Sequence, residues 1–207
     1  MQQADTTLTQ AERSALSDKA MLDAAMALVL EHGTDKTTLA MIGDKSGYSR
    51  GLVTYRFGSK DGLYDALCKS ISRRWLEYLK IGVGDKTGVE AMCAALDTIY
   101  QFEQELPDPA RALQILYSGA ASPSAGFQQT AVGIRQRQKS DVAEWVRGGQ
   151  QAGTVRSNVD ADEVAAQYVA YITGMTYLWL ISPNSFDFSK ANEVMKRHLR
   201  ESLTPAR

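Results

Sequence analysis

Hydrophobic residues recur every three to four positions along most of this 207-residue chain. That period is typical of α-helices that bury one face. No run of alternating apolar and polar residues, which would indicate a half-buried strand, interrupts it. The sequence therefore predicts an all-α protein whose helix ends can be placed from capping residues, glycines and prolines.

The first helix is predicted to begin at Thr9, which has capping-box spacing to Glu12, or alternatively at Ser17. Its apolar stripe follows the helical period, and Gly33 is placed to end it. We expect this helix to brace the segment that follows, with residues 1–16 as a tail.

Residues 37–60 predict two short helices around a tight glycine turn. Thr37 or Thr38 caps the first helix, Gly47 ends it, and Ser49 caps the second helix. A pair of short helices across a glycine turn is typical of a motif that places its second helix in the major groove of DNA.

The second short helix has one apolar and one polar face. Val53 and Phe57 stand four residues apart and point into a core. The residues left on the outer face are Arg50, Gly51, Thr54, Tyr55 and Arg56. Arginine suits a two-bonded contact with guanine, threonine can touch a thymine methyl, and glycine allows close approach of the backbone. A solvated basic face is the alternative reading.

Many residues of this region stand at fixed spacing: Gly33, Thr37, Thr38, Ile42, Ser46, Gly47, Tyr48, Ser49, Gly51, Tyr55, Phe57, Ser59, Lys60 and Leu63. Together they resemble the amino-terminal DNA-binding signature of TetR/AcrR-type transcriptional regulators. By this resemblance, Thr38, Tyr55, Arg56 and Lys60 fall where the family grips phosphates. The candidate DNA-binding residues are thus Thr38, Ser49, Arg50, Gly51, Thr54, Tyr55, Arg56 and Lys60.

A longer helix is predicted from Ser59 to about Leu79, and the glycines at 82 and 84 break the pattern after it. We therefore expect a DNA-binding domain in residues 1–60, a connecting helix in 61–82, and a helical regulatory and dimerisation domain in 83–207.

The second domain is predicted to contain only helices. Its first helix is predicted to begin at a capping box of Thr87 and Glu90 and to end at Pro107, and its second to begin at Asp108-Pro109 and end at Ser122-Pro123. A third helix is predicted from about Ser124 to Arg147, followed by a looser stretch with Gly148, Gly149 and Gly153. A fourth helix is predicted to begin at Asp160, and a turn at Pro183-Asn184-Ser185 leads to a last amphipathic helix with Lys196, Arg197 and Arg200 on its charged face.

The stretch from Val164 to Ser182 carries no charged residue and is nearly long enough to span a bilayer. Polar residues such as Gln167 and Thr173 are spread around it, and Asp187 follows soon after. We expect a helix that is buried in a core and a subunit interface, with a membrane span as the alternative.

Charge is concentrated at the helix-turn-helix stretch. The chain has a net charge of −1, but Thr34 to Lys60 holds five Lys or Arg against two Asp, an excess of three positive charges. The part from Val83 onward has an excess of two negative charges, with 12 cations and 14 anions. This distribution favours nucleic acid as the partner of the first region.

Little in the sequence indicates an enzyme or a bound cofactor. His32 and His198 are far apart and lack metal-ligand spacing, and no nucleophile motif is present. Cys68 and Cys93 lie on separate predicted helices, which favours reduced thiols in a cytosolic protein over a disulfide. We expect no catalytic residue, metal or cofactor, and a cytoplasmic location.

The carboxy-terminal helices are rich in rings and methionines, which either form a core or line a ligand pocket. By the resemblance, an effector binds between such helices, and the candidate ligand-binding residues are Met92, Tyr100, Tyr117, Phe127, Trp145, Tyr168, Tyr171 and Met175. The resemblance also implies a homodimer in which the last two helices, from about Asp160 to Leu203, pair across a two-fold axis.

The expected function is sequence-specific DNA binding at a pseudo-palindromic operator, as a transcriptional regulator and most commonly a repressor, released by an unidentified small molecule. Two alternatives remain open at this point. One is a regulator that binds DNA without ligand control, and the other is a helical protein–protein adaptor that binds no DNA.

Overall fold

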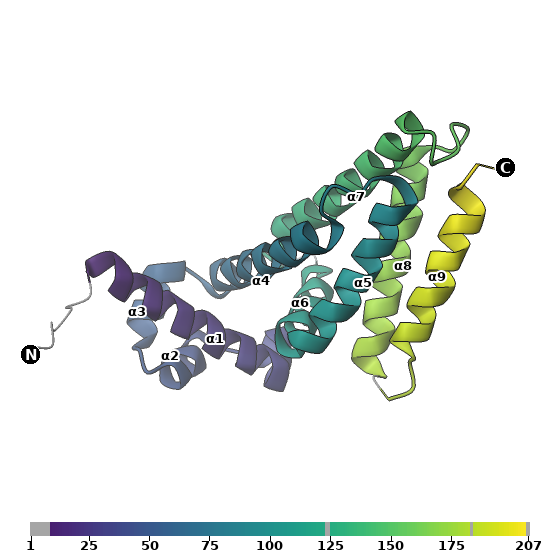
Figure 1. Ribbon diagram of the computed structural model, residues 1–207. Coiled ribbons are helices and arrows are strands. Elements are labelled where there is room, and N and C mark those ends of the chain that lie inside the picture. Colours follow the sequence, from purple (N-terminus) through teal and green to yellow (C-terminus); the bar gives the residue numbers. More distant parts are fainter. Residues whose placement is uncertain (1–8, 123–124, 183, 206–207) are drawn as a thin grey trace, which may run out of the picture.

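The computed structural model describes residues 9–122, 125–182 and 184–205, and within them the chain is all-α (Figure 1). Its helices are α1 (Gln10–Lys36), α2 (Leu39–Ser46), α3 (Arg50–Phe57), α4 (Lys60–Val83), α5 (Gly88–Glu105), α6 (Pro107–Ala120), α7 (Gln128–Gln151), α8 (Ala161–Ile181) and α9 (Phe188–Leu203). The predicted fold class is confirmed. The short helices α2 and α3 lie at one end of the molecule, and α8 and α9 lie at the other.

Five described helix starts fall at predicted polar caps, including Ser59 of α4, whose hydroxyl accepts from the Gly62 amide at 3.0 Å. Thr9 and Glu12 form a capping box, which decides between the two predicted starts of α1 and makes residues 10–16 helical. The side chains of Thr38, Ser49 and Asp160 accept hydrogen bonds from the first backbone amides of α2, α3 and α8. These caps satisfy amides that have no partner inside the helix.

Gly33 interrupts α1 without ending it. Its φ of 75° and ψ of 177° are not helical, yet the helix resumes and runs to Lys36. A positive φ is accessible to glycine at little cost, because glycine has no Cβ. The prediction that Gly33 ends the first helix is wrong, although the backbone does depart from helical geometry at this residue.

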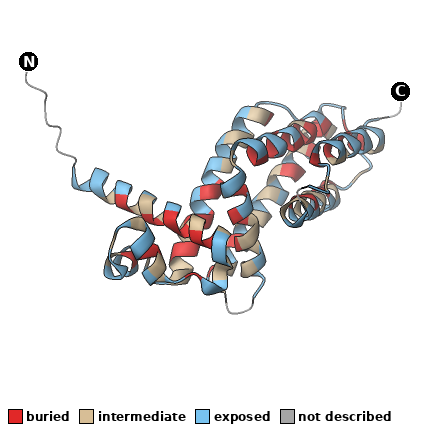
Figure 2. Cartoon of the chain, turned by 90° about the horizontal axis from the view of Figure 1, so that it is seen from below, coloured by how far each residue is buried: buried red, intermediate tan, exposed pale blue. Residues whose placement is uncertain are grey.

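Two large apolar clusters hold the helices together. One cluster joins the helices α1, α2, α3, α4 and α6, and its fully buried residues include Val29, Ile42, Leu63 and Leu116. The other joins α5 with α7, α8 and α9. The buried positions lie where helices face one another, including along α1 in Figure 2. Because α6 packs on α1, the two predicted domains share part of a core across the break near residue 84.

The starts of α5 and α6 differ from the prediction. Thr87 is the N-cap of α5 but makes no side-chain capping bond, so the predicted capping box is absent. Glu90 instead lies 3.7 Å from Arg200 of α9. Pro107 begins α6 instead of only stopping α5, and Leu106 is the cap between them. A proline at the first helical position loses no hydrogen bond.

Gly148 and Gly149 do not loosen the chain as predicted, because both lie inside α7. A Cβ at Gly149 would lie 2.6 Å from the Gly88 Cα, so glycine at 149 lets α7 touch the start of α5. A Cβ at Gly148 would lie 3.2 Å from the Thr87 Cβ. Close approach to the Gly88 backbone explains Gly149, and close approach to the Thr87 side chain explains Gly148.

Three predicted features fall on positions outside the described residues. They are the helix stop at Pro123, the helix start near Ser124 and the turn residue Pro183. Helix α7 as described begins at Gln128.

Lys196 was placed on the charged outer face of α9, but its side chain is only 9% exposed. It turns toward α5 and forms an ion pair with Asp97, and its Nζ lies 2.8 Å from Glu193 Oε1. The prediction was wrong because helical period alone does not show that an acidic residue of another helix lies opposite.

Helix α8 is long and apolar enough to cross a membrane by length and composition, and 22% of its most apolar 18 residues are buried inside the chain. Length and composition are weak evidence, since helices of soluble cores pass the same test. Its exposed side carries an uncharged stripe of Ala166, Ala170, Gly174, Tyr177, Leu178 and Ile181. We call these residues the α8 stripe.

Candidate nucleic-acid interface and ligand cavity

A tight junction holds α2 and α3 at a fixed angle. Gly47 ends α2 in a left-handed conformation with φ 79°, and the Tyr48 amide donates to the Gly43 carbonyl at 2.9 Å. A Cβ at Gly43 would lie 2.8 Å from the Tyr48 carbonyl oxygen and 3.0 Å from the Arg50 nitrogen. Gly43 therefore lets α3 begin directly against α2, a role that the sequence interpretation missed.

The outer face of α3 agrees with the predicted orientation. Val53 is fully buried and Phe57 half-buried, whereas the predicted outward residues are all exposed: Arg50, Gly51, Thr54, Tyr55 and Arg56. Tyr55 is 82% exposed, which is unusual for so large a ring. We call these five exposed residues the reader face. Whether they contact DNA stays a prediction.

Thr38 and Ser49 sit at the ends of the two helices with their hydroxyls in use. The Met41 amide donates to Thr38 Oγ1 at 3.2 Å, and the Leu52 amide donates to Ser49 Oγ at 3.1 Å. Both residues are exposed, so a phosphate can still reach the free amides of these helix starts.

Arg56 is already paired within the chain. Its Nε donates to Asp18 Oδ1 at 2.6 Å, and a terminal nitrogen donates to the second oxygen of the same carboxylate. This hydrogen bonding raises the pKa of Arg56. The pair ties α3 to α1, so Arg56 has a structural role beside its predicted phosphate contact.

Lys60 also bonds to the protein itself. Its Nζ donates to the backbone carbonyls of Thr34 and Asp35, each at 3.1 Å, and lies 6.0 Å from the ring centre of Tyr64. The Tyr64 hydroxyl donates to the same Thr34 carbonyl at 2.8 Å. The end of α1 is therefore held by the first turns of α4.

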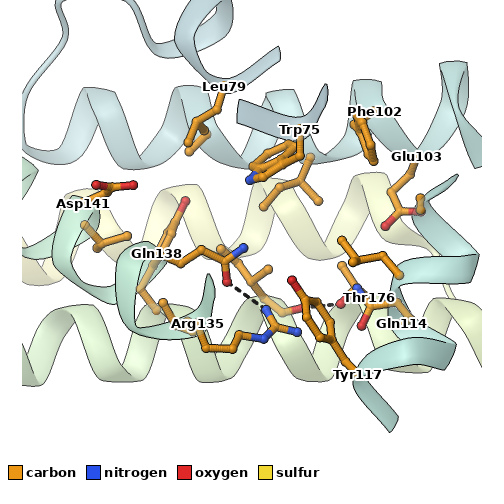
Figure 3. Close-up of a pocket in the computed structure, with 18 of the residues that line it drawn as sticks. Trp75, Leu79, Phe102, Glu103, Gln114, Tyr117, Arg135, Gln138, Asp141 and Thr176 are labelled. Carbon is orange, nitrogen blue, oxygen red and sulfur yellow. Dashed lines mark hydrogen bonds between the residues drawn. The ribbon is translucent and has the colours of Figure 1, made fainter. Parts of the chain in front are cut away.

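A cavity of about 80 Å³ lies among α4, α5, α6, α7 and α8 (Figure 3). Its wall is mainly apolar, with Trp75 and Leu79 from α4, Phe102 from α5, and Trp145 from α7. Rings are packed edge to face at one side, where Trp75 and Phe102 have centroids 5.5 Å apart. An apolar cavity with a few polar groups is the usual form of a small-molecule site.

Three of the predicted ligand-binding residues line this cavity: Tyr117, Trp145 and Tyr168. The other five lie elsewhere: Met92, Tyr100, Phe127, Tyr171 and Met175. Tyr100 is 37% exposed and stacks near Phe188, and Phe127 packs against Tyr64. The ring-rich pattern is shared by core and cavity, so it could not separate them.

The sequence interpretation missed the charged residues of the wall, Glu103, Arg135 and Asp141, and the apolar residues that α4 contributes, Trp75 and Leu79. The Arg135 guanidinium lies 4.2 Å from the ring centre of Tyr117, and its terminal nitrogen donates to Gln138 Oε1 at 3.0 Å. Glu103 could have been found, because it follows Leu96 and Ile99 by seven and four residues and so shares their buried face.

Glu103 is buried, with 4% of its surface exposed, and its Oε2 atom has no hydrogen-bond partner. Burial raises the pKa of this carboxyl to about 8, because an ionised carboxylate loses its hydration inside the protein. The side chain points toward the space between the helices in Figure 3.

The cavity and the end of α1 are connected through α6. Tyr117 lines the cavity, and two residues further on Gly119 meets α1, where a Cβ would lie 2.9 Å from Thr34 Oγ1. The carbonyl of Thr34 is the one that Lys60 and Tyr64 bind. A displacement of α6 by a bound molecule would thus press on the same turn that anchors α4.

The two thiols are buried and free. Burial raises the pKa of Cys68 to about 12 and raises that of Cys93, which disfavours the reactive thiolate. Among the residues that the structure describes, no three metal-ligating side chains come together.

Two family models match the chain. The model described as bacterial regulatory proteins, tetR family, matches residues 21–67, and that described as BetI-type transcriptional repressor, C-terminal, matches residues 90–204. The first match contains the reader face, and the second contains most of the cavity wall.

Curated relatives are similar over most of the chain. The HTH-type transcriptional regulator TtgR of Pseudomonas putida is 25% identical over 81% of each chain. The probable acrEF/envCD operon repressor of Escherichia coli is 24% identical over 82% of this chain and 79% of its own length.

Solved structures share the fold. A SmeT–triclosan complex covers 91% of this chain and 92% of its own with a TM-score of 0.77 and 18% identity. SmeT is described as the repressor of the Stenotrophomonas maltophilia multidrug efflux pump SmeDEF.

Proposed function

The chain belongs to the TetR family of DNA-binding transcriptional regulators, and we propose that it is a repressor that leaves its operator when a small molecule fills the cavity. Members of this family are regulators and not enzymes. The observation that carries the proposal is the connection between an exposed reader face and a cavity through α6 and the end of α1.

The reader face supplies the proposed contacts with DNA. Arg50 and Tyr55 are exposed and form no hydrogen bond or ion pair through their side chains within the described chain, so they can approach bases or phosphates. Thr54 offers a methyl group for thymine and Gly51 allows the backbone close. Thr38, Ser49 and Lys60 stand at helix starts, where phosphates bind backbone amides.

The α8 stripe supplies the proposed dimer contact. The stripe is uncharged and exposed on an apolar helix. A second copy of the chain, related by a two-fold axis, would cover it. Gly174 lies in the stripe, and a Cβ there would meet nothing within 4 Å in the single chain. Two readers related by this axis would enter major grooves about 34 Å, or a multiple of that, apart.

Release follows from a difference in affinity between two arrangements of the dimer. A molecule that enlarges the cavity would push on Tyr117 and move α6 against Thr34, which changes the spacing of the two α3 helices. Such coupling is typically worth about 1–3 kcal/mol, or about 5- to 150-fold in operator affinity.

A selection of genomic fragments bound by the purified protein tests the proposal. We expect a pseudo-palindromic motif, and loss of binding in Arg50→Ala combined with Tyr55→Ala. Because both side chains are exposed, the variant should keep its circular dichroism spectrum and melting temperature.

Two results would contradict the proposal. If no duplex binds in a salt-sensitive manner and the double variant behaves as the parent, the chain is a protein–protein adaptor. If an operator is found but no ligand in a screen changes its affinity, the protein is a ligand-insensitive regulator.

A further inference from the structure

We propose that the cavity takes an organic amine whose protonated nitrogen donates a hydrogen bond to Glu103 and whose apolar body lies among the rings of Trp75 and Phe102. The inference deepens the proposed function. It rests on that function only in one respect, namely that binding of the amine releases DNA.

Two polar groups of the described wall have incomplete bonding, the Tyr117 hydroxyl and the Glu103 carboxyl, and only Glu103 can carry a charge that pairs with a cation at neutral pH. Its Oε2 atom is buried without a partner, and Glu103 forms no ion pair with a described residue. Leaving such a group unbonded costs stability, whereas a leucine at this position of α5 would not. A ligand that brings an N–H group to Oε2 removes this cost.

The other charged groups of the wall already have partners. Arg135 lies on the Tyr117 ring and bonds Gln138, and Asp141 receives a hydrogen bond from Arg137 Nε at 2.8 Å. Arg135 is itself desolvated, because burial lowers its pKa. An anionic ligand at Arg135 would leave Glu103 unbonded, and this favours a cation.

The rings beside Glu103 suit the body of such a ligand. Phe102 is the neighbour of Glu103 in sequence, and its ring contacts both Trp75 and Tyr78 edge to face at 5.5 Å and 5.3 Å. Aromatic faces attract an ammonium group as well as apolar carbon, so they favour the same cation. The small cavity favours a compact amine.

Binding of the amine requires that Glu103 lose its proton to solvent. Since the pKa of Glu103 lies at about 8 in the empty cavity, amine affinity should rise as the pH increases from about 6 to 8. The other titratable groups of the wall are Tyr117, Arg135, Asp141 and Tyr168. Burial raises the pKa of both tyrosines and lowers that of Arg135, and the loss of the pH dependence in Glu103→Gln assigns the change to Glu103.

The test is calorimetric titration of the full chain, without DNA, with four compact probes that share a phenyl ring. They are phenethylamine, phenethyltrimethylammonium, phenethyl alcohol and the anion hydrocinnamate, each at millimolar concentration. We expect phenethylamine to bind at least about tenfold more tightly than the other three and to release about one proton at pH 6.

Glu103→Gln keeps the shape of the side chain and should weaken phenethylamine by about 10- to 100-fold, with little change for the alcohol. The matched control is Glu105→Gln, two residues away on α5, exposed and outside the cavity. It should bind all four probes as the parent does.

Several results would overturn the inference: no binding of phenethylamine, equal binding of the quaternary or neutral probe, preference for hydrocinnamate, or an unchanged Glu103→Gln variant. Failure of the proposed function is a separate result. It would appear as phenethylamine binding that leaves operator affinity unchanged, and in that case the assignment of the amine to Glu103 would still stand.

Discussion

The reader face and the cavity wall use polar groups in opposite states. On α3 the polar groups are exposed, the capping hydroxyls are bonded, and Arg56 is paired with Asp18. In the cavity, Glu103 is buried and incompletely bonded. Exposed charges interact weakly and are screened by salt, whereas a desolvated group discriminates strongly between ligands. Selectivity for DNA must therefore come from many contacts, and selectivity for the ligand from very few.

The largest effect on DNA binding is expected from a variant that separates the two reader faces of the proposed dimer. Gly174→Trp places a bulky ring on the α8 stripe and should prevent pairing of two chains. Without the second reader, operator affinity should fall by about 10²- to 10⁴-fold. Light scattering and fluorescence anisotropy measure the mass and the affinity.

Gly133→Trp is the matched control, because Gly133 is also exposed within a helix, α7, and a Cβ at this position would meet nothing within 4 Å. This variant should remain a dimer with parental affinity. A Gly174→Trp chain that stays dimeric would place the interface elsewhere.

The next effect is on stability and concerns the buried Glu103 carboxyl, whose Oε2 atom has no hydrogen-bond partner. The pKa of Glu103 is raised from 4.5 to about 8 in the folded state, so the folded chain keeps a proton that the unfolded chain loses in this window. The free energy of unfolding should therefore fall as pH rises from 4.5 to about 8, by up to about 1.4 kcal/mol per unit.

Glu103→Gln should lose this dependence of the free energy of unfolding on pH. Near pH 8 it should be more stable than the parent by a few kcal/mol, on the order of the energy that corresponds to the pKa shift. Urea denaturation at a series of pH values measures it. Parallel curves for the two proteins would mean that Glu103 is ionised and bonded in the folded state.

A smaller effect tests the contact between the two regions. Tyr64→Phe removes the hydrogen bond to the Thr34 carbonyl, which Lys60 still binds, and should destabilise the fold by about 1 kcal/mol. Tyr55→Phe alters an exposed hydroxyl and should leave the urea midpoint unchanged. Equal midpoints for both variants would show that the Thr34 bond contributes nothing to stability.

The smallest effect sharpens the account of the reader face. Asp18→Asn removes the anion that holds Arg56 and should raise DNA affinity by about three- to tenfold, with a salt dependence steeper by about one counterion. Asp23→Asn, which breaks an exposed pair with Lys19 on the same helix, should not. An unchanged salt slope in Asp18→Asn would mean that Arg56 does not reach phosphate.

Features set by neighbours in sequence were predictable, and features set by packing were not. Thr9 and Ser49 cap helices through amides three residues away, so the sequence contains the whole signal. The outward orientation of α3 followed from helical period for the same reason. Thr87 had the same local signal, but its side chain lies against Gly148 of α7 and makes no cap.

The cavity was only partly predictable. Rings and methionines indicated α5 to α8 but not α4, and Tyr117, Trp145 and Tyr168 do line the space. Tyr100 carries the same type of side chain, yet it faces outward near Phe188. Glu103 did have a signal, an acidic residue on an apolar stripe, whereas the position of Arg135 over Tyr117 depends on how α6 and α7 cross.

The contacts of Lys60 and Tyr64 with α1 have a consequence for protein engineering. Tyr64 binds the main-chain carbonyl of residue 34, and Lys60 binds those of residues 34 and 35. The joint therefore does not depend on which side chains stand there, apart from the fit of the Thr34 side chain against Gly119. A chimera that keeps the kinked end of α1 and the first turns of α4 can therefore exchange the reader helices of one regulator for those of another. Such a hybrid would bind a different operator and would be released from it by the same effector.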